Sequence, residues 1–321
     1  MPDNKAGQEA KQRFDNVAKP VGSLGKFEDL IIKIAEMTGT ADVDIKRRAV
    51  AVFCSTNGIV EEGVSSSPNE VTRIVADNVA NGMSSINAMA RVEKADVFMI
   101  DMGIGSPTRN FASEPAMTEK ELQMAVEKGR LKAHELYEEG YRIIATGEVG
   151  MGNTTTATAV ICAMLGLEPE KAVGSGAGLD ETHMDIKRKV ITDAIQKYKL
   201  YGASAHKILS CVGGYDIAGM AGMFIGGAEC HLPVVIDGVI SAAAALAAYR
   251  IDKNCIDYMI PSHMSRELSA AAAMKELGLE PVINADMALG EGTGAVLIFG
   301  MLDAVLAVYN ETATYADLGL V

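Results

Sequence analysis

The sequence Arg142-Ile143-Ile144-Ala145-Thr146-Gly147-Glu148-Val149-Gly150-Met151-Gly152-Asn153-Thr154-Thr155 decides the fold, because it joins a buried strand to a helix through a glycine-rich loop. Residues 142–146 form an apolar run of strand length, and the residues after the loop are apolar and helical in character. Glycines let backbone N–H groups approach a ligand, and a helix that starts at such a loop directs its positive end toward an anion. The segment predicts an α/β unit whose loop binds an anion and carries a carboxylate, Glu148.

Four further apolar runs repeat this order of strand, polar or glycine-rich loop, and helix. They span residues 49–54, 97–102, 234–236 and 258–260. Such alternation is typical of an α/β fold, and we predict a mostly parallel sheet with helices on both faces. Because parallel strands collect their ligands at their carboxyl ends, the loops after these strands should converge on one crevice.

Composition restricts the partners of the chain. The chain has 321 residues, of which 49% are hydrophobic, and a formal net charge of −13, so it can bury a sizeable core. No basic cluster could neutralise a run of phosphates, and we predict neither nucleic acid nor an anionic membrane surface as a partner. The histidines never stand at helical i, i+4 spacing with one another, and we predict no metal.

Cysteine usage and hydropathy bear on the compartment. The five cysteines form no Cys-x-x-Cys pair and lie mostly in apolar segments, as buried thiols in a reducing compartment do. No apolar signal stretch follows Met1, and the most apolar stretch, residues 232–248, is short and interrupted by Asp237 and Gly238. We therefore predict a cytoplasmic protein without a membrane-spanning segment.

Two glycine-rich loops are candidates for a phosphate site. In the first, backbone N–H groups, the hydroxyls of Thr154 and Thr155 and the helix dipole could face an anion, and the alternative is a packing turn. The loop lacks the Gly-Lys-Ser/Thr of a Walker A motif and the spacing of a dinucleotide site, so ATP and NAD are not expected. The second, Gly174-Ser175-Gly176-Ala177-Gly178, precedes a helix with Lys187, which either answers the phosphate charge or is solvated.

Polar residues at the ends of other apolar segments complete the candidate site. Asp237 is costly to bury unless it is paired, so we expect it to order backbone groups or ribose hydroxyls. His263 is a ligand contact or a second hydrogen-bonding residue behind one. Glu291 stands between glycines in Leu289-Gly290-Glu291-Gly292-Thr293-Gly294, where partial burial suits a general base; capping of the following helix is the alternative.

Six motifs occur in the order and form of a known family. Lys19-Pro20-Val21-Gly22-Ser23-Leu24-Gly25, the segment 147–155, Val212-Gly213-Gly214-Tyr215-Asp216, Asp237-Gly238, Pro261-Ser262-His263 and the segment 289–294 resemble the nicotinate-nucleotide:dimethylbenzimidazole phosphoribosyltransferases. The resemblance implies a Rossmann-like large domain, here residues 26–295, and a small helical domain built from residues 1–25 and 296–321. It also implies a dimer with the site near the interface, and no cofactor.

The resemblance assigns roles to single residues. Glu291 is the expected catalytic base and Glu148 the second carboxylate of the site. Gly150, Lys187 and Ser265 are the expected contacts of nicotinate mononucleotide, with Lys187 and the neighbouring loops serving the phosphate. The full predicted substrate-binding set is Gly150, Asn153, Thr154, Gly176, Lys187, Asp237, Ser265, Ser67 and Val75.

Three departures from the family pattern concern the acceptor side. Thr56-Asn57-Gly58 stands where the family usually has Asp-His-Gly, Val75 stands where a benzimidazole-binding glutamine can occur, and the loop between Gly103 and Pro115 is short. Loss of the glutamine amide removes a partner for a ring nitrogen, so a phenol or a benzimidazole is the expected acceptor. The alternatives are a weakly active or non-catalytic subunit paired with a paralogous chain and a phosphate-sugar binding or kinase-like protein. We predict a homodimer or such a heterodimer.

Overall fold

The computed structural model describes residues 1–174 and 180–320 and shows an α/β fold. Within these residues, five strands form one sheet: β1 (Arg48–Cys54), β2 (Ala95–Asp101), β3 (Ile143–Val149), β4 (Val234–Ile236) and β5 (Met259–Pro261). The strand order is β2-β1-β3-β4-β5, and every neighbouring pair is parallel. The predicted mostly parallel sheet is therefore confirmed, and each predicted strand exists.

Strand β3 is longer than the sequence predicted. Its ladder with β1 continues to the pairs Phe53 with Glu148 and Cys54 with Val149. The prediction ended this strand at residue 146 because glycine and glutamate are typical of loops, so its placement of Glu148 in the loop is wrong. Glu148 belongs to the last pairs of the ladder, and the loop starts after Val149.

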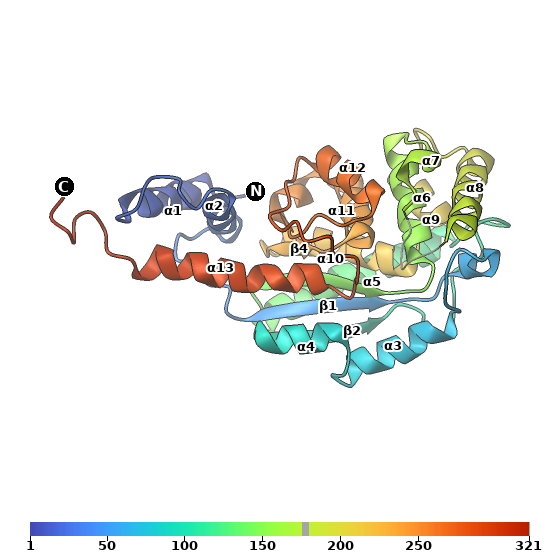
Figure 1. Ribbon diagram of the computed structural model, residues 1–321, viewed down its shortest axis with the longest axis horizontal. Coiled ribbons are helices and arrows are strands. Elements are labelled where there is room, and N and C mark those ends of the chain that lie inside the picture. Colours follow the sequence, from blue (N-terminus) through green and yellow to red (C-terminus); the bar gives the residue numbers. More distant parts are fainter. Residues whose placement is uncertain (175–179, 321) are drawn as a thin grey trace.

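Helices cover both faces of the sheet (Figure 1). The α-helices are α1 (Asn4–Asn16), α2 (Lys26–Thr38), α3 (Glu70–Ala80), α4 (Ser85–Val92), α5 (Glu119–Glu138), α6 (Asn153–Leu165), α7 (Pro169–Ala172), α8 (Glu181–Tyr198), α9 (Ala205–Val212), α10 (Tyr215–Glu229), α11 (Val239–Ile251), α12 (Leu268–Leu277) and α13 (Thr293–Glu311). Two 3-10 helices, η1 (Gly58–Glu62) and η2 (Lys253–Tyr258), join them.

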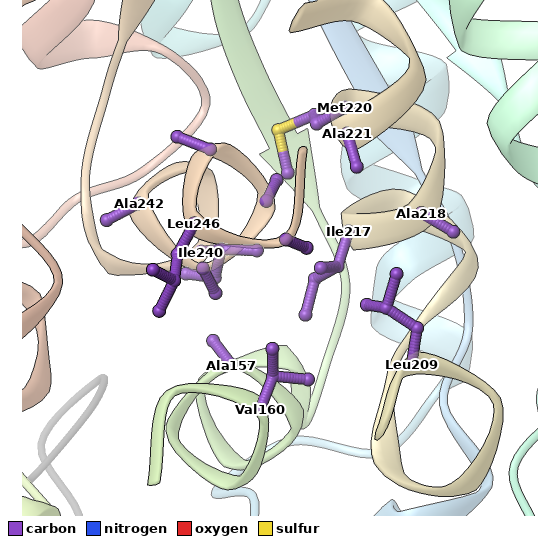
Figure 2. Packing of buried hydrophobic residues seen from close by; sticks show 14 of the residues in the cluster. Ala157, Val160, Leu209, Ile217, Ala218, Met220, Ala221, Ile240, Ala242 and Leu246 are labelled. Atoms are coloured by element: carbon purple, nitrogen blue, oxygen red, sulfur yellow. The ribbon is translucent and has the colours of Figure 1, made fainter. Parts of the chain in front are cut away.

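Alternating side chains of β1 feed two apolar clusters, one on each face. Ala49, Ala51 and Phe53 belong to one cluster, and the residues between them belong to the other. The first cluster packs α6, α9, α10 and α11 closely, with alanines between larger side chains (Figure 2). These small residues let the helices approach one another, which makes this part of the core rigid.

Helix α13 links the sheet to the N-terminal helices (Figure 1). Its first half packs on β3 and α4, and its end meets α1, where the Phe14 and Tyr309 ring centroids are 4.6 Å apart. It is the one helix of the described residues that is long and apolar enough to cross a membrane, but half of it is buried, as in a core helix of a globular protein. The grouping of residues 1–25 with 296–321 into a small domain stays a prediction.

Helices α5 and α3 begin in different ways. Thr118 forms a capping box with Glu121 at the start of α5. Ser67 does not cap α3, because the chain turns once more and the helix begins at Glu70. That extra turn leaves Ser67 in the loop after β1, where it faces the pocket described below.

Candidate active site

A pocket of about 300 Å³ lies at the carboxyl edge of the sheet. The ends of β3, β4 and β5 contribute Glu148, Asp237 and His263 to its wall. The strand order reverses direction between β1 and β3, and the crevice at such a switch point is where α/β sheets bind ligands. Residues from the loops after β1, β3, β4 and β5 line the pocket as predicted, whereas the loop after β2 contributes none of the lining residues.

Most of the predicted site residues line this one pocket. They are Glu148, Glu291, Gly150, Asn153, Thr154, Asp237, Ser265, Ser67 and Val75. Lys187 lies behind the wall, with its Nζ 3.1 Å from Thr154 Oγ1. Gly176 lies outside the described residues. The fold thus brings together predicted site residues that are more than 200 positions apart in the chain. Their individual roles stay predictions.

Glu291 is held in place by an unusual backbone. Gly290, Glu291 and Gly292 have φ angles of 86°, 60° and 91°, in the left-handed region that favours glycine. The turn lies directly against β3, because a Cβ placed on Gly147 would collide with the Glu291 carbonyl oxygen. A residue larger than glycine at position 147 would displace the turn, so the two glycine-framed motifs of the sequence form one packed unit.

The side chain of Glu291 points to a third element. Its Oε2 accepts a hydrogen bond of 3.0 Å from the backbone N–H of Ile86, in the first turn of α4. A carboxylate at a helix N-terminus is stabilised by the helix dipole. Gly292, which has no side chain, is the N-cap of α13, so the alternative that Glu291 caps the helix following it is wrong; Glu291 bonds instead to the first turn of α4. The bond aims the carboxylate across the pocket and leaves it partly exposed.

Glu148 is buried, at 7% exposure, and its environment differs from that of Glu291. Burial, and next the charge of Asp216, raise the pKa of Glu148 to about 8. Near neutral pH the carboxyl is therefore largely protonated. The two carboxyls of the pocket are thus suited to different tasks, since only Glu291 combines exposure with a helix N-terminus.

Asp216 is a residue of the site that sequence reasoning did not use. It is fully buried at the start of α10, and Asn153 Nδ2 donates to its Oδ2 at 3.1 Å and also to Glu148 Oε2. The only signal was its place in the quoted motif 212–216, directly before an apolar helix. The amide nitrogen of Asn153 is occupied within the protein, so any contact of Asn153 with a substrate involves its other atoms.

Three helices with glycine N-caps begin at the pocket or beside it: Gly152 and Gly238 line the pocket, and Gly292 follows the lining residue Glu291. The N-cap residues of α6, α11 and α13 are Gly152, Gly238 and Gly292, and no cap side chain bonds to the first-turn N–H groups. Asp237 accepts a hydrogen bond of 2.9 Å from Ala295 N–H in the first turn of α13, so it orders backbone as expected. Helix N-termini favour anions, which offsets the acidic side chains around the pocket.

Lys187 supplies a buried positive charge beside α6. Its side chain is 0% exposed, so the alternative that it is solvated is wrong. Burial lowers the pKa of Lys187 to about 8, and the charge of the nearby Glu267 opposes this effect. A phosphate at the N-terminus of α6 would favour the charged form of this lysine, which suits it for the predicted phosphate contact.

Part of the pocket wall is apolar. Val71 and Val75, one helical turn apart on α3, line the pocket, as do Val64 and Leu289. Leu289 is 57% exposed, as a residue at the mouth of a pocket is. The sequence predicted Val75 alone; Val71 stands one helical turn before it and could have been found by that spacing. An aromatic ring fits such a wall.

The departure at Thr56-Asn57 is built into the structure. Thr56 Oγ1 donates to the Gly103 carbonyl at 3.1 Å, and Asn57 Nδ2 donates to the Met151 carbonyl at 3.1 Å. The Asn57 bond ties the loop after β1 to the glycine-rich loop after β3, and the Thr56 bond ties it to the loop after β2. The replaced residues thus support the site where the family usually has Asp-His.

Comparisons with known proteins agree with the motifs. A family model described as a phosphoribosyltransferase matches residues 1–320. The nicotinate-nucleotide–dimethylbenzimidazole phosphoribosyltransferases of Acetivibrio thermocellus and Ruminiclostridium cellulolyticum are 40% and 39% identical, over 96% and 97% of this chain and 92% of theirs. The crystal structure of CobT from Thermus thermophilus superposes with a TM-score of 0.94 at 34% identity, over 99% of both chains. The chain therefore belongs to the family of the nicotinate-nucleotide–dimethylbenzimidazole phosphoribosyltransferases.

Proposed function

We propose that this enzyme moves 5-phosphoribose from nicotinate mononucleotide to a small aromatic base, giving an α-ribotide and nicotinate for cobamide synthesis. The observation that carries the proposal is that one pocket combines anion-binding elements with an apolar wall. The glycine-capped N-termini of α6 and α11, with Lys187 behind Thr154, suit a phosphate. Val71, Val75 and Leu289 offer apolar surface to an aromatic ring. The names of its relatives support the same reaction.

Few catalytic groups are needed for this transfer. The pyridinium of nicotinate mononucleotide leaves as a neutral ring, so its departure requires no general acid. One base, a fixed ribose phosphate and an oriented acceptor suffice. Glu291 is our candidate for the base, and attack at C1′ from the face opposite the leaving group gives the α product.

The acceptor is a phenol or a benzimidazole. Val75 offers no hydrogen bond to the second nitrogen of an azole, whereas a phenol has no such nitrogen to satisfy. A phenol has an ordinary pKa near 10, so it depends more strongly on a base than an azole does. These two arguments favour a phenolic acceptor without removing the benzimidazoles.

We further propose that the enzyme is cytoplasmic and works as a homodimer. The rival is a weakly active subunit that pairs with a paralogous chain. The hydrogen bonds of Thr56 and Asn57 favour the active form, because the residues at this departure hold the loops of the site together.

The decisive experiment is nicotinate release by the purified chain alone. Nicotinate mononucleotide is supplied with phenol, p-cresol, dimethylbenzimidazole and adenine in competition, and products are identified by mass. We expect phosphoribosyl transfer, with phenolic products prominent. Transfer to azoles alone would contradict the phenolic acceptor, and no transfer at all would favour the rival that needs a partner chain.

A further inference from the structure

Asp216 is a buried acidic group that the proposed reaction does not use. Its side chain is 0% exposed, and it stands at the first turn of α10. The next residue, Ile217, points into the apolar cluster between α6 and α11 (Figure 2). The backbone that carries Asp216 is thus fixed by the rigid part of the core.

One amide connects Asp216 to the pocket. Asn153 Nδ2 donates to Glu148 Oε2 and, at 3.1 Å, to Asp216 Oδ2. An amide nitrogen has two hydrogens, so this bridge uses both. The other oxygen, Asp216 Oδ1, accepts from Ile217 N–H at 2.9 Å. The position of Asp216 is therefore passed through Asn153 to the Glu148 carboxyl in the pocket wall.

Within residues 1–174 and 180–320, no positive side chain forms an ion pair with Glu148 or Asp216. The charged groups that face Glu148 are acidic and come from three elements: Asp216 from α10, Asp237 after β4 and Glu291 before α13. Cys54 from β1 also lies near, and burial raises the pKa of its thiol, so it stays neutral.

Such a pair is stable only when it retains a proton. Two carboxylates that share one buried hydrogen-bonding partner repel each other where water cannot screen them. Glu148 borders the pocket, and its neutral form can donate a hydrogen bond there. Asp216 has no place in the pocket wall, so its influence on a substrate passes through Glu148.

We propose that Asp216 is a positioning residue of the transferase site: the Asn153 amide that it shares with Glu148 fixes the Glu148 carboxyl in the pocket wall, and its own negative charge keeps that carboxyl in its neutral, proton-bearing form. This inference rests on the proposed function, since a neutral Glu148 leaves Glu291 as the charged base beside the acceptor. The consequence is that Asp216, which lines no part of the pocket, sets the pH range of the reaction.

The test titrates Glu148 directly in the unliganded protein. Glutamate side-chain carboxyls labelled with ¹³C are followed by NMR, and Glu148→Gln identifies the signal. In the wild type we expect a midpoint well above that of exposed glutamates. In Asp216→Asn the like charge is gone, and the midpoint should fall by about one pH unit or more. In Asn153→Ala the hydrogen bond that favours the charged form is lost, and the midpoint should rise.

A matched control removes a like charge without touching the bridge. Asp237→Asn takes away a carboxylate of the same pocket that Asn153 does not contact, so the Glu148 midpoint should fall less than in Asp216→Asn. Equal falls in the two variants would overturn the proposal. A fall of the Glu148 midpoint in Asn153→Ala would also overturn the proposal, because that is the result expected when water enters a loosened site. If Asp216→Asn does not fold, the direction in Asn153→Ala decides alone.

The activity readout separates this inference from the proposed function. In the transfer assay, Asp216→Asn should move the alkaline limb of the kcat/KM profile to lower pH, with the KM for nicotinate mononucleotide unchanged. A wild-type protein without transfer would contradict the proposed function while the NMR titration still decides the role of Asp216. If the wild type is active and the alkaline limb of its kcat/KM profile coincides with that of Asp216→Asn, the positioning role is overturned.

Discussion

At the scale of single residues, the site separates two carboxyls by their surroundings. Glu291 is partly exposed and bonded to the N-terminus of α4, whereas Glu148 is buried in β3 beside other acids. Both sit between glycines in the sequence, which made them look alike. Their difference arises from contacts with Ile86 and Asp216, residues far from them along the chain.

Glu291→Gln should lower kcat for the proposed transfer at least a hundredfold, because a positioned base typically contributes about 10²–10⁴-fold. The amide oxygen can still accept from Ile86 N–H, so the fold and the binding of nicotinate mononucleotide should be retained. Nicotinate release measures the first and calorimetric titration the second. Unchanged turnover would mean that another group is the base.

The buried carboxyl of Glu148 should make stability depend on pH. Its pKa rises from an ordinary 4.5 to about 8 on folding, so the folded state holds a proton that the unfolded chain releases. The free energy of unfolding should therefore be greatest below pH 4.5 and should fall as the pH rises to about 8. The fall is at most about 1.4 kcal/mol for each unit between these two pKa values.

Urea unfolding of the wild type and Glu148→Gln across this pH window checks that dependence. The variant lacks the titrating carboxyl and should show the shallower slope, with the remainder arising from Asp216, whose pKa burial also raises. Parallel slopes for the two proteins would show that Glu148 does not hold the proton.

Val75→Gln should shift the acceptor preference toward benzimidazoles. The glutamine amide places a hydrogen-bond donor and acceptor in an otherwise apolar wall, where a ring nitrogen gains about 0.5–1.5 kcal/mol and a phenol gains nothing. Competition between p-cresol and dimethylbenzimidazole in one reaction measures the ratio. Val75→Leu is the matched apolar control, and a ratio equal in both variants would place the control of acceptor choice elsewhere.

At the scale of elements, the turn that carries Glu291 depends on the strand beneath it. Gly147 lies in β3 where a side chain would strike the Glu291 carbonyl. Strand and turn come from distant parts of the sequence, and each has its own glycine motif. The motifs therefore specify a contact between two elements, and this contact positions the Glu291 turn.

Gly147→Ala should lower the free energy of unfolding by about 1–3 kcal/mol, the usual cost of overpacking. Because the turn must move to admit the methyl group, turnover should fall as well. Denaturant unfolding and the transfer assay measure both effects. Gly238→Ala is the control for stability, since its Cβ would have nothing nearer than 3.9 Å. Equal stability of the two variants would mean that the turn moves freely.

Element order was predictable because hydrophobic runs and glycine loops are local signals. The fully buried strand β1 was placed to within one residue, whereas β3 was ended three residues early at residue 146. Site residues that closely follow the end of a strand, such as Asp237 and His263, could be predicted from the sequence. The burial of Lys187 and the contacts of Asp216 and Ile86 were not, because they depend on packing between elements far apart in the chain.

At the scale of the whole molecule, a net charge of −13 surrounds a site proposed to bind an anion. Helix N-termini and Lys187 act at short range, but an approaching nucleotide meets the charge of the whole surface first. For the proposed substrate, short-range attraction by the helix N-termini and Lys187 would therefore oppose long-range repulsion by the acidic surface.

Salt should consequently raise kcat/KM for nicotinate mononucleotide, because it screens repulsion beyond about 10 Å at 0.1 M while leaving buried contacts largely intact. The kcat/KM for a neutral phenol acceptor should stay nearly constant. Initial rates over a range of sodium chloride concentrations, at fixed pH, give both. A decrease for the nucleotide would show that local positive charge governs its approach.

The turn at Glu291 also has a consequence for the order in which the protein is made. The last strand ends at Pro261, so all the strands of the sheet can emerge from the ribosome before Glu291 does. Until then the gap beside Gly147 has nothing to fill it. The proposed base is thus in place only after every strand has been made. Incomplete chains that contain every strand but end before Glu291 should fold in part and show no transfer.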